Sequence, residues 1–275
     1  PGALVRDEAE LEEDAARLGH LCRLIARNRQ PDLPVKGIMV LVPWAAGAGD
    51  ETAAAAAEAC RRDLAAARAA LRVSCPAVAL VCDLERAPGF PELVANFKPE
   101  KRKTGRIGRK FPLLPELGGA RVADVFASGL AWFCTAEFPT WIYEFFTLEQ
   151  TETEPPGQAT ERNVRLYQIL AQLLERHQRF GRVLAPVLAN ESGEPAMFGG
   201  CYLAATGPKP EHEQAFIAAV FHRLIEEHKN ASWSPQAVRE DARQRVEGKW
   251  GLVAALVGIV LLLAGTAYGL THIDW

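Results

Sequence analysis

The chain has 275 residues, 49% of them hydrophobic and 24% charged, so it is long enough to bury a core and too apolar for a disordered polypeptide. Collagen-like, coiled-coil and disulfide-scaffold proteins are excluded by the same composition. The net charge of −3 excludes a general attraction to nucleic acid, and six cysteines without a C-x-x-C pair favour buried thiols in a reducing compartment.

The N-terminal region predicts an amphipathic helix. The first residue is proline rather than methionine, from which we expect an excised piece of a longer protein. Residues 7–29 begin acidic and end basic, which places charges where the helix dipole favours them. The apolar stripe of this helix consists of Leu11, Leu18, Leu21, Leu24 and Ile25.

The next region predicts an α/β fold. Residues 35–42 and 77–82 are short, β-branched and nearly all apolar, as buried strands are. Between them, residues 51–72 form an alanine-rich stretch of about six helical turns. A strand, a long helix and a second strand make a crossover unit, which implies parallel strands.

Residues 98–110 form a basic run, in which seven of thirteen residues are lysine or arginine. No aromatic residue interrupts it, which disfavours stacking of single-stranded nucleic acid. Most runs of this kind are solvated loops, and contact with anionic lipid headgroups is the next interpretation. The candidates for lipid contact are Lys101, Arg102, Lys103, Arg106, Arg109 and Lys110.

The second half of the chain is mainly helical before its apolar end. Residues 121–146 are rich in aromatic residues and predict a core helix broken near Pro139. A helix over 160–188, an apolar strand over 198–205 and a helix over 211–228 follow. The apolar face of the last helix contains Phe216, Val220, Phe221, Leu224 and Ile225.

Residues 250–270 contain no charge and predict a transmembrane helix, because 21 residues span about 31 Å. A buried helix of a soluble domain is the alternative, but such helices normally carry polar residues. Lys249, Trp250 and Tyr268 are expected at the membrane interfaces. Arginines in the charged connector 235–249 place residues 1–249 in the cytoplasm and the C-terminus across the membrane.

No complete active site can be assembled from the sequence. The motifs GxxxxGK[ST], GxGxxG, GxSxG and HExxH are absent, and the histidines lack metal-ligand spacing. We therefore expect no catalytic residues, no metal, no small-molecule substrate and no nucleic-acid partner. The chain is not expected to be an enzyme.

Several segments resemble, in the same order, the cytoplasmic region of the IcmF/TssM (ImpL-like) family of type VI secretion membrane proteins. These segments are LCRLIARNRQPDLPVKGI (21–38), AVALVCDLERAPGF (77–90), GRKFP (108–112) and FGGCYLAATG (198–207). The resemblance covers nearly the whole chain, and in that family a transmembrane helix also follows the cytoplasmic region.

The resemblance implies a partial P-loop-NTPase-like parallel sheet with a helical extension and one C-terminal transmembrane helix. Residues 1–115 are then the second half of a GTPase-like domain and 116–234 the helical extension with one returning strand, followed by the connector (235–249) and the span (250–270). The guanine-specificity motif falls on residues 80–83, where only Asp83 fits. Asp83 is thus a vestigial nucleotide-binding position, or a residue that caps the following turn.

The function implied is a membrane-anchored scaffold in the bacterial inner membrane, in contact with other membrane and baseplate proteins of the secretion complex and with lipid. A first alternative is a conformational switch that binds GTP or ATP through a P-loop upstream of this chain. A second alternative is a tail-anchored adaptor unrelated to secretion. No cofactor is expected within the chain itself.

Overall fold

The computed structural model describes residues 7–113, 119–148, 157–188, 197–209 and 213–271. The chain divides into two compact units, residues 1–232 and 233–275. The helices of the first unit are α1 (Glu8–Arg29), α2 (Asp50–Leu71), α3 (Phe90–Ala95), α4 (Pro99–Thr104), α5 (Gly119–Trp132), α6 (Phe138–Leu148), α7 (Gln158–Leu188) and α8 (Ile217–Glu226). The second unit contains α9 (Pro235–Thr271).

The strands are short. They are β1 (Ile38–Pro43), β2 (Val73–Ser74), β3 (Ala77–Cys82), β4 (Ile107–Lys110), β5 (Phe198–Leu203), β6 (Ala205–Thr206), β7 (Gln214–Ala215) and β8 (Ser232–Trp233). Short helical turns connect several elements: η1 (Trp44–Gly47), η2 (Leu84–Arg86) and η4 (Glu227–Asn230) are 3-10 helices, and η3 (Phe133–Glu137) is a π-helical turn.

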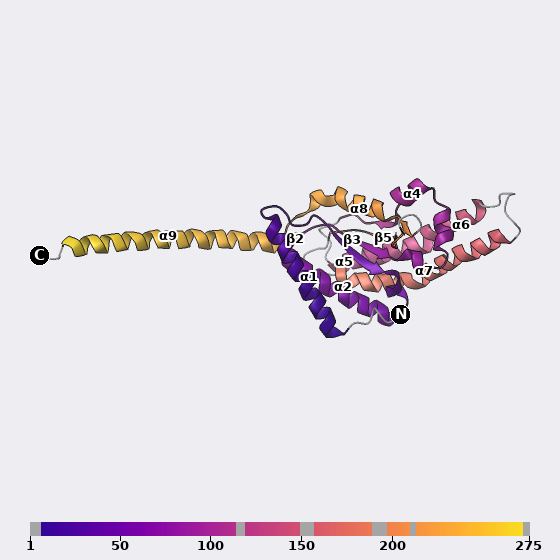
Figure 1. Ribbon diagram of the computed structural model, residues 1–275, viewed down its shortest axis with the longest axis horizontal. Coiled ribbons are helices and arrows are strands. Elements are labelled where there is room, and N and C mark those ends of the chain that lie inside the picture. Colours follow the sequence, from indigo (N-terminus) through magenta and orange to yellow (C-terminus); the bar gives the residue numbers. More distant parts are fainter. Residues whose placement is uncertain (1–6, 114–118, 149–156, 189–196, 210–212, 272–275) are drawn as a thin grey trace. The chain divides into compact units, whose positions relative to one another are not determined.

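A four-stranded sheet in the order β1-β3-β5-β4 forms the centre of the first unit. Strands β1, β3 and β5 are parallel, and β4 is antiparallel to β5. The predicted strand-helix-strand crossover is confirmed, because β1 and β3 pair in parallel register from Ile38 with Ala77 to Pro43 with Cys82. In Figure 1, α8 lies on one side of this sheet and α2 and α7 on the other. The fold is α/β, as predicted.

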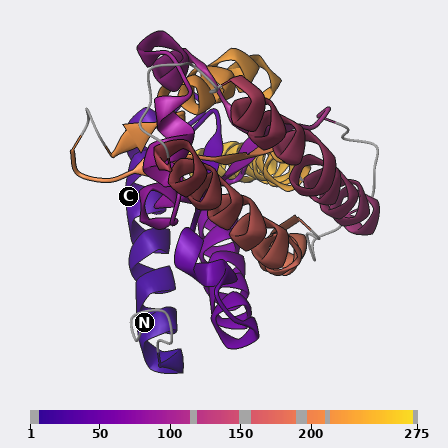
Figure 2. The ribbon, with the colours of Figure 1, turned by 90° about the vertical axis from the view of Figure 1, so that its right-hand side faces the viewer.

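Helix α2 packs against α1, and Figure 2 shows the two side by side. Thr52 closes its first turn, since its hydroxyl oxygen accepts the backbone N–H of Gly49 at 3.0 Å. Glu58 receives hydrogen bonds from both Arg61 and Arg62 one turn later. These hydrogen bonds lower the pKa of the Glu58 carboxyl to about 2.

The predicted apolar stripe of α1 is only partly buried. The helix buries Gly19 and Cys22 and leaves Leu21, Leu24 and Ile25 exposed. The expectation that these three side chains face a core is therefore wrong. Cys22 rather than Leu21 belongs to the small apolar cluster that α1 forms with Leu71, and the three exposed side chains lie on another arc of the helix.

The two edges of the sheet differ. β1 was expected to be fully buried, but it is an edge strand of the described sheet, and the Leu41 side chain is 56% exposed. Its six residues carry no charge. The opposite edge strand, β4, has four residues and ends in Arg109 and Lys110, a common protection against edge-to-edge pairing.

The basic run is not the solvated loop expected from its charge. Residues 99–104 form α4, and residues 107–110 form β4. The backbone explains the difference: the N–H of Phe216 donates to the Arg102 carbonyl at 2.7 Å, and Ile107 is buried in the sheet.

The break near Pro139 is confirmed and takes the form of η3 between α5 and α6. Pro139 has no N–H to continue the α-helical ladder, and the N–H of Phe138 bonds to the Phe133 carbonyl five residues back. Phe133 and Phe138 are both buried in the main core. The predicted helix over 160–188 and strand over 198–205 correspond to α7 and β5.

A buried ion pair joins the end of α8 to the sheet. Glu227 is 5% exposed and pairs with Arg223. A methyl group on Gly199 of β5 would lie 2.5 Å from the Glu227 carboxylate, so only glycine leaves room for it. The predicted helix over 211–228 is shorter than expected, and Phe221 and Ile225 of its predicted apolar face are exposed.

The predicted connector and membrane span form one helix, α9. Its residues from Pro235 to Leu263 are long and apolar enough to cross a membrane, and none of the most apolar stretch is buried. The connector carries its charges in pairs one turn apart, such as Arg243 with Glu247 and Arg245 with Asp241.

Candidate functional site

The carboxyl ends of β3 and β5 bring Asp83 and Thr206 together. Ligands of open parallel sheets bind at this edge. Asp83 has a left-handed backbone with φ +63°, and its N–H donates to the Thr206 hydroxyl at 3.0 Å. The same hydroxyl donates to the Asp83 carboxylate at 3.2 Å. Asp83, the only predicted nucleotide-binding residue, thus has one oxygen engaged by its neighbour in the fold.

Two further carboxylates surround this pair. Glu85 accepts the backbone N–H of Thr206 at 2.9 Å. A methyl group on Gly207 would lie 3.2 Å from a Glu85 oxygen and 2.8 Å from a Glu213 oxygen, so both carboxylates border the same glycine. Three carboxylates therefore lie at this edge, one of them paired with Lys209 at 3.5 Å.

Helix α7 packs against the segments that follow β1 and β3. The Gly89 backbone, at φ +85°, approaches α7 so closely that a methyl group there would lie 2.0 Å from the Arg165 carbonyl oxygen. After β1, a methyl group on Gly47 would lie 2.8 Å from the ring of Phe180 in α7. The helical extension thus contacts both connections at the carboxyl edge of the sheet.

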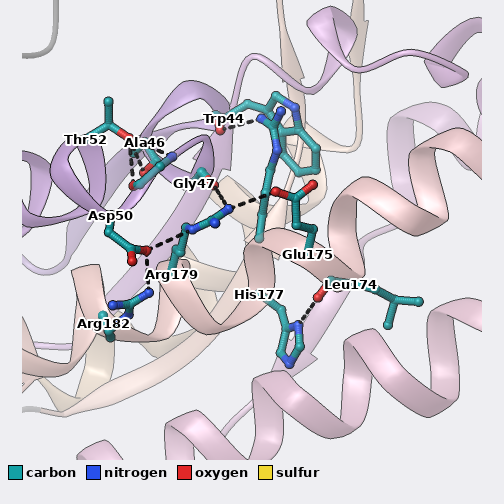
Figure 3. A network of polar contacts seen from close by, with 12 residues as sticks. Trp44, Ala46, Gly47, Asp50, Thr52, Leu174, Glu175, His177, Arg179 and Arg182 are labelled. Atoms are coloured by element: carbon teal, nitrogen blue, oxygen red, sulfur yellow. Dashed lines mark hydrogen bonds and ion pairs between the residues drawn. The ribbon is translucent and has the colours of Figure 1, made fainter.

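Arginines of α7 hold the segment after β1 in place. Figure 3 shows Arg179 and Arg182 meeting Asp50 at the start of α2, at 3.1 and 2.8 Å. These hydrogen bonds lower the pKa of Asp50. Arg179 also donates to the Gly47 carbonyl at 3.1 Å. The pairs are exposed, so their effect is to orient the two elements more than to stabilise them.

Arg176 is more deeply placed than its two neighbours. It donates to the Trp44 carbonyl at 3.2 Å, and its guanidinium lies 4.8 Å from the centre of the Trp44 ring. The Trp44 ring in turn contacts Phe180, with ring centres 5.6 Å apart. The sequence gives no sign of this arrangement, because nothing in the spacing of Trp44 and Arg176 links them along the chain.

The six candidates for lipid contact fall into two groups. Lys101, Lys103, Arg106 and Lys110 are exposed. Arg102 is half-buried and donates to the Phe97 carbonyl at 2.9 Å, and Arg109 lies over the ring of Trp132 at 4.3 Å. The second group therefore has contacts within the fold.

The predicted interface residues lie along α9. Lys249 is exposed, and Trp250 is 70% exposed. The side chain of Tyr268 lies outside the described residues. Tryptophan and lysine at the border of an apolar helix are typical of the membrane-water boundary.

Burial keeps four of the cysteines in the neutral thiol form. Burial raises the pKa of Cys60, Cys75 and Cys82 to about 11, and that of Cys201 to about 12. Among the residues described, no group of three metal-binding side chains is close enough to hold an ion.

Comparison with known proteins identifies the family. The model of the IcmF-related N-terminal domain matches residues 11–244, which is most of the chain. No curated protein and no solved structure gave a significant match. Membership of this family indicates a component of a type VI secretion membrane complex. The α/β unit and the apolar helix after it thus belong to a member of the IcmF-related family.

Proposed function

We propose that this chain is a membrane-anchored cytoplasmic scaffold of a type VI secretion membrane complex, held in the bacterial inner membrane by α9. The observation that carries this proposal is the apolar surface of α9 in an IcmF-related chain. Each leucine, isoleucine or valine between residues 252 and 263 favours insertion by about 0.3–0.6 kcal/mol. Exposure of the same apolar side chains to water would be unfavourable.

The orientation follows from the charges beside the span. Arg239, Arg243, Arg245 and Lys249 precede it within one connector. Positively charged residues close to a membrane helix remain on the cytoplasmic side. In this proposal the first unit faces the cytoplasm, where it contacts baseplate and membrane proteins of the complex.

A non-enzymatic role for the first unit is part of the proposal. The sequence has no phosphate-binding loop, and the Asp83 carboxylate bonds to Thr206. These observations support a degenerate NTPase-like domain that acts through its surfaces. Lipid is a further proposed partner, with the exposed cations Lys101, Lys103, Arg106 and Lys110 as one candidate surface.

A nucleotide-dependent switch is the second candidate function. It is favoured by the uncharged edge of β1, which pairs with no further strand among the described residues and at which an upstream strand with a phosphate-binding loop would extend the parallel sheet. Asp83 lies at the end of the next strand, where a base would approach.

Three experiments test these proposals. Alkaline carbonate should leave the chain in the membrane fraction and detergent should release it; release by carbonate would contradict anchoring. Thiol labelling at R245C from the cytoplasmic side and at H272C from the opposite side tests the orientation. For the switch, fluorescent GTP and ATP are titrated into the full-length protein: no binding together with normal complex assembly supports the scaffold, and binding that controls assembly supports the switch.

A further inference from the structure

The second half of α1 exposes three neighbouring aliphatic side chains on one face of the helix. Leu21, Leu24 and Ile25 are 57%, 44% and 42% exposed. At 100° per residue these three side chains share one arc of the helix, about a third of a turn away from the buried Cys22. The face is therefore distinct from the one that packs against α2.

Arginines border this face on both sides. Arg27 and Arg29 fall on opposite sides of the arc, and no acidic residue occurs between Ala15 and Gln30. Within the described parts of the chain, the ion pairs involve neither Arg27 nor Arg29. Aliphatic side chains flanked by arginines are the pattern of a helix that lies in the headgroup region of an anionic bilayer.

The position of this face in the first unit also points to the membrane. Cys22 belongs to a small apolar cluster that Ala231 joins. Ala231 lies four residues before Pro235, where α9 begins. The second half of α1 is thus at the place where the chain leaves the first unit towards the membrane span.

The basic run lies elsewhere. Its Arg102 bonds to Phe216, directly before the first residue of α8, whereas Ala231 follows the last residues of α8 and η4. The two basic surfaces are therefore at opposite ends of a helix about 15 Å long. Of the two, only the α1 surface combines charge with exposed aliphatic side chains.

We propose that the face of α1 formed by Leu21, Leu24 and Ile25 lies on the anionic lipid surface of the membrane that anchors α9. This inference rests on the anchoring proposed above. Tethering makes the contact intramolecular, so a weak affinity for lipid is sufficient. Gly248 and Gly251 stand at the junction of connector and span, where an added methyl group would meet no atom within 4 Å, and glycine lowers the cost of bending a helix there.

Spin labels on the full chain in lipid nanodiscs test this contact. L24C carries the label on the proposed face, and E10C, on the exposed first half of the same helix, is the control. The labels are introduced into a chain whose six native cysteines are replaced by alanine, because Cys22 lies on the same helix two residues from the L24C label. Oxygen, which concentrates in lipid, and a water-soluble nickel complex report the environment of each label.

In discs with one-third anionic lipid, we expect the ratio of oxygen to nickel accessibility at L24C to rise several-fold over neutral discs. The ratio at E10C should not change. Replacing Arg27 or Arg29 by glutamine should lower the ratio of lipid-bound to unbound α1 about fivefold for each arginine. Salt at 1 M should have a similar effect, since it shortens the screening length to about 3 Å.

Two further labels separate the possible failures. L256C reports insertion of α9, and K103C reports the rival basic run. A water-exposed L24C beside an inserted L256C would overturn the α1 contact and leave the anchor intact. A water-exposed L256C would overturn the anchor itself. Lipid exposure at K103C but not at L24C would assign the membrane contact to the basic run. Spin-spin coupling between L24C labels would show that a second copy of the chain covers the face of α1.

Discussion

Replacement of Gly89 by alanine tests the packing of α7 against the carboxyl edge of the sheet. The substitution adds a methyl group to a left-handed backbone, at a cost of about 1 kcal/mol. It also places that group 2.0 Å from the Arg165 carbonyl oxygen. The methyl position is fixed by the main chain and the oxygen belongs to main chain, so no side-chain rotation can relieve the clash. Separating the two elements should cost about 1–3 kcal/mol more.

Gly157 provides a matched control, because it has φ +96° and no atom within 4 Å of an added methyl group. Urea unfolding of the detergent-solubilised chain, followed by tryptophan fluorescence, measures both variants; Trp44 is buried against α7 and reports on this region. We expect G157A to lose about 1 kcal/mol and G89A about 2–4 kcal/mol. Equal losses would show that α7 does not contact the loop after β3.

Three further predictions concern charges. Replacing Arg223 by leucine should destabilise the first unit by about 3–5 kcal/mol in urea unfolding, because it leaves the Glu227 carboxylate buried and unpaired. Replacing both Arg223 and Glu227 by leucine should recover most of this loss. The pKa of the Glu58 carboxyl is lowered from 4.5 to about 2, so its ion pairs stabilise the fold fully above pH 4.5 and are lost as the pH falls towards 2. In E58Q the free energy of unfolding should therefore depend less on pH over this range, and an unchanged pH profile would contradict the prediction. D83A should leave the nucleotide affinity of the full-length protein unchanged in a titration with fluorescent GTP, whereas a guanine-selective loss would identify Asp83 as a base-binding residue.

The three parallel strands of the sheet could be predicted because each has a strong local signal. Residues 77–82 are uniformly apolar between turn residues, and β3 is buried along almost its whole length. The alanine-rich segment could only be a helix, and its length required parallel strands. The break near Pro139 followed from the chemistry of proline, although its π-helical form was not predicted.

Exposure could not be predicted from the same patterns. Leu21 and Leu41 look like core residues in the sequence, yet whether a partner covers them depends on which elements lie beside α1 and β1. The basic run shows the reverse: its charge suggested a loop, and a backbone hydrogen bond from Phe216 together with one buried isoleucine gave it structure.

Asp83 was predicted as a site residue, but its hydrogen-bond partner Thr206 was not. Thr206 lies three residues beyond the end of β5, and parallel strands bring their carboxyl ends to one edge, so the topology favours a contact between the two residues. The arginines of α7 had no such signal. Arg179 and Asp50 are separated by more than a hundred residues, and only the packed structure brings them together.

The narrow space between Gly199 and Glu227 has an evolutionary consequence. A side chain at position 199 would collide with the carboxylate at 227, so neither residue can change freely while the other remains. In IcmF-related sequences we therefore expect the two positions to covary, with glycine at 199 where an acid occupies 227. A larger residue at 199 should be accompanied by a small, uncharged one at 227 and by the loss of the arginine at 223.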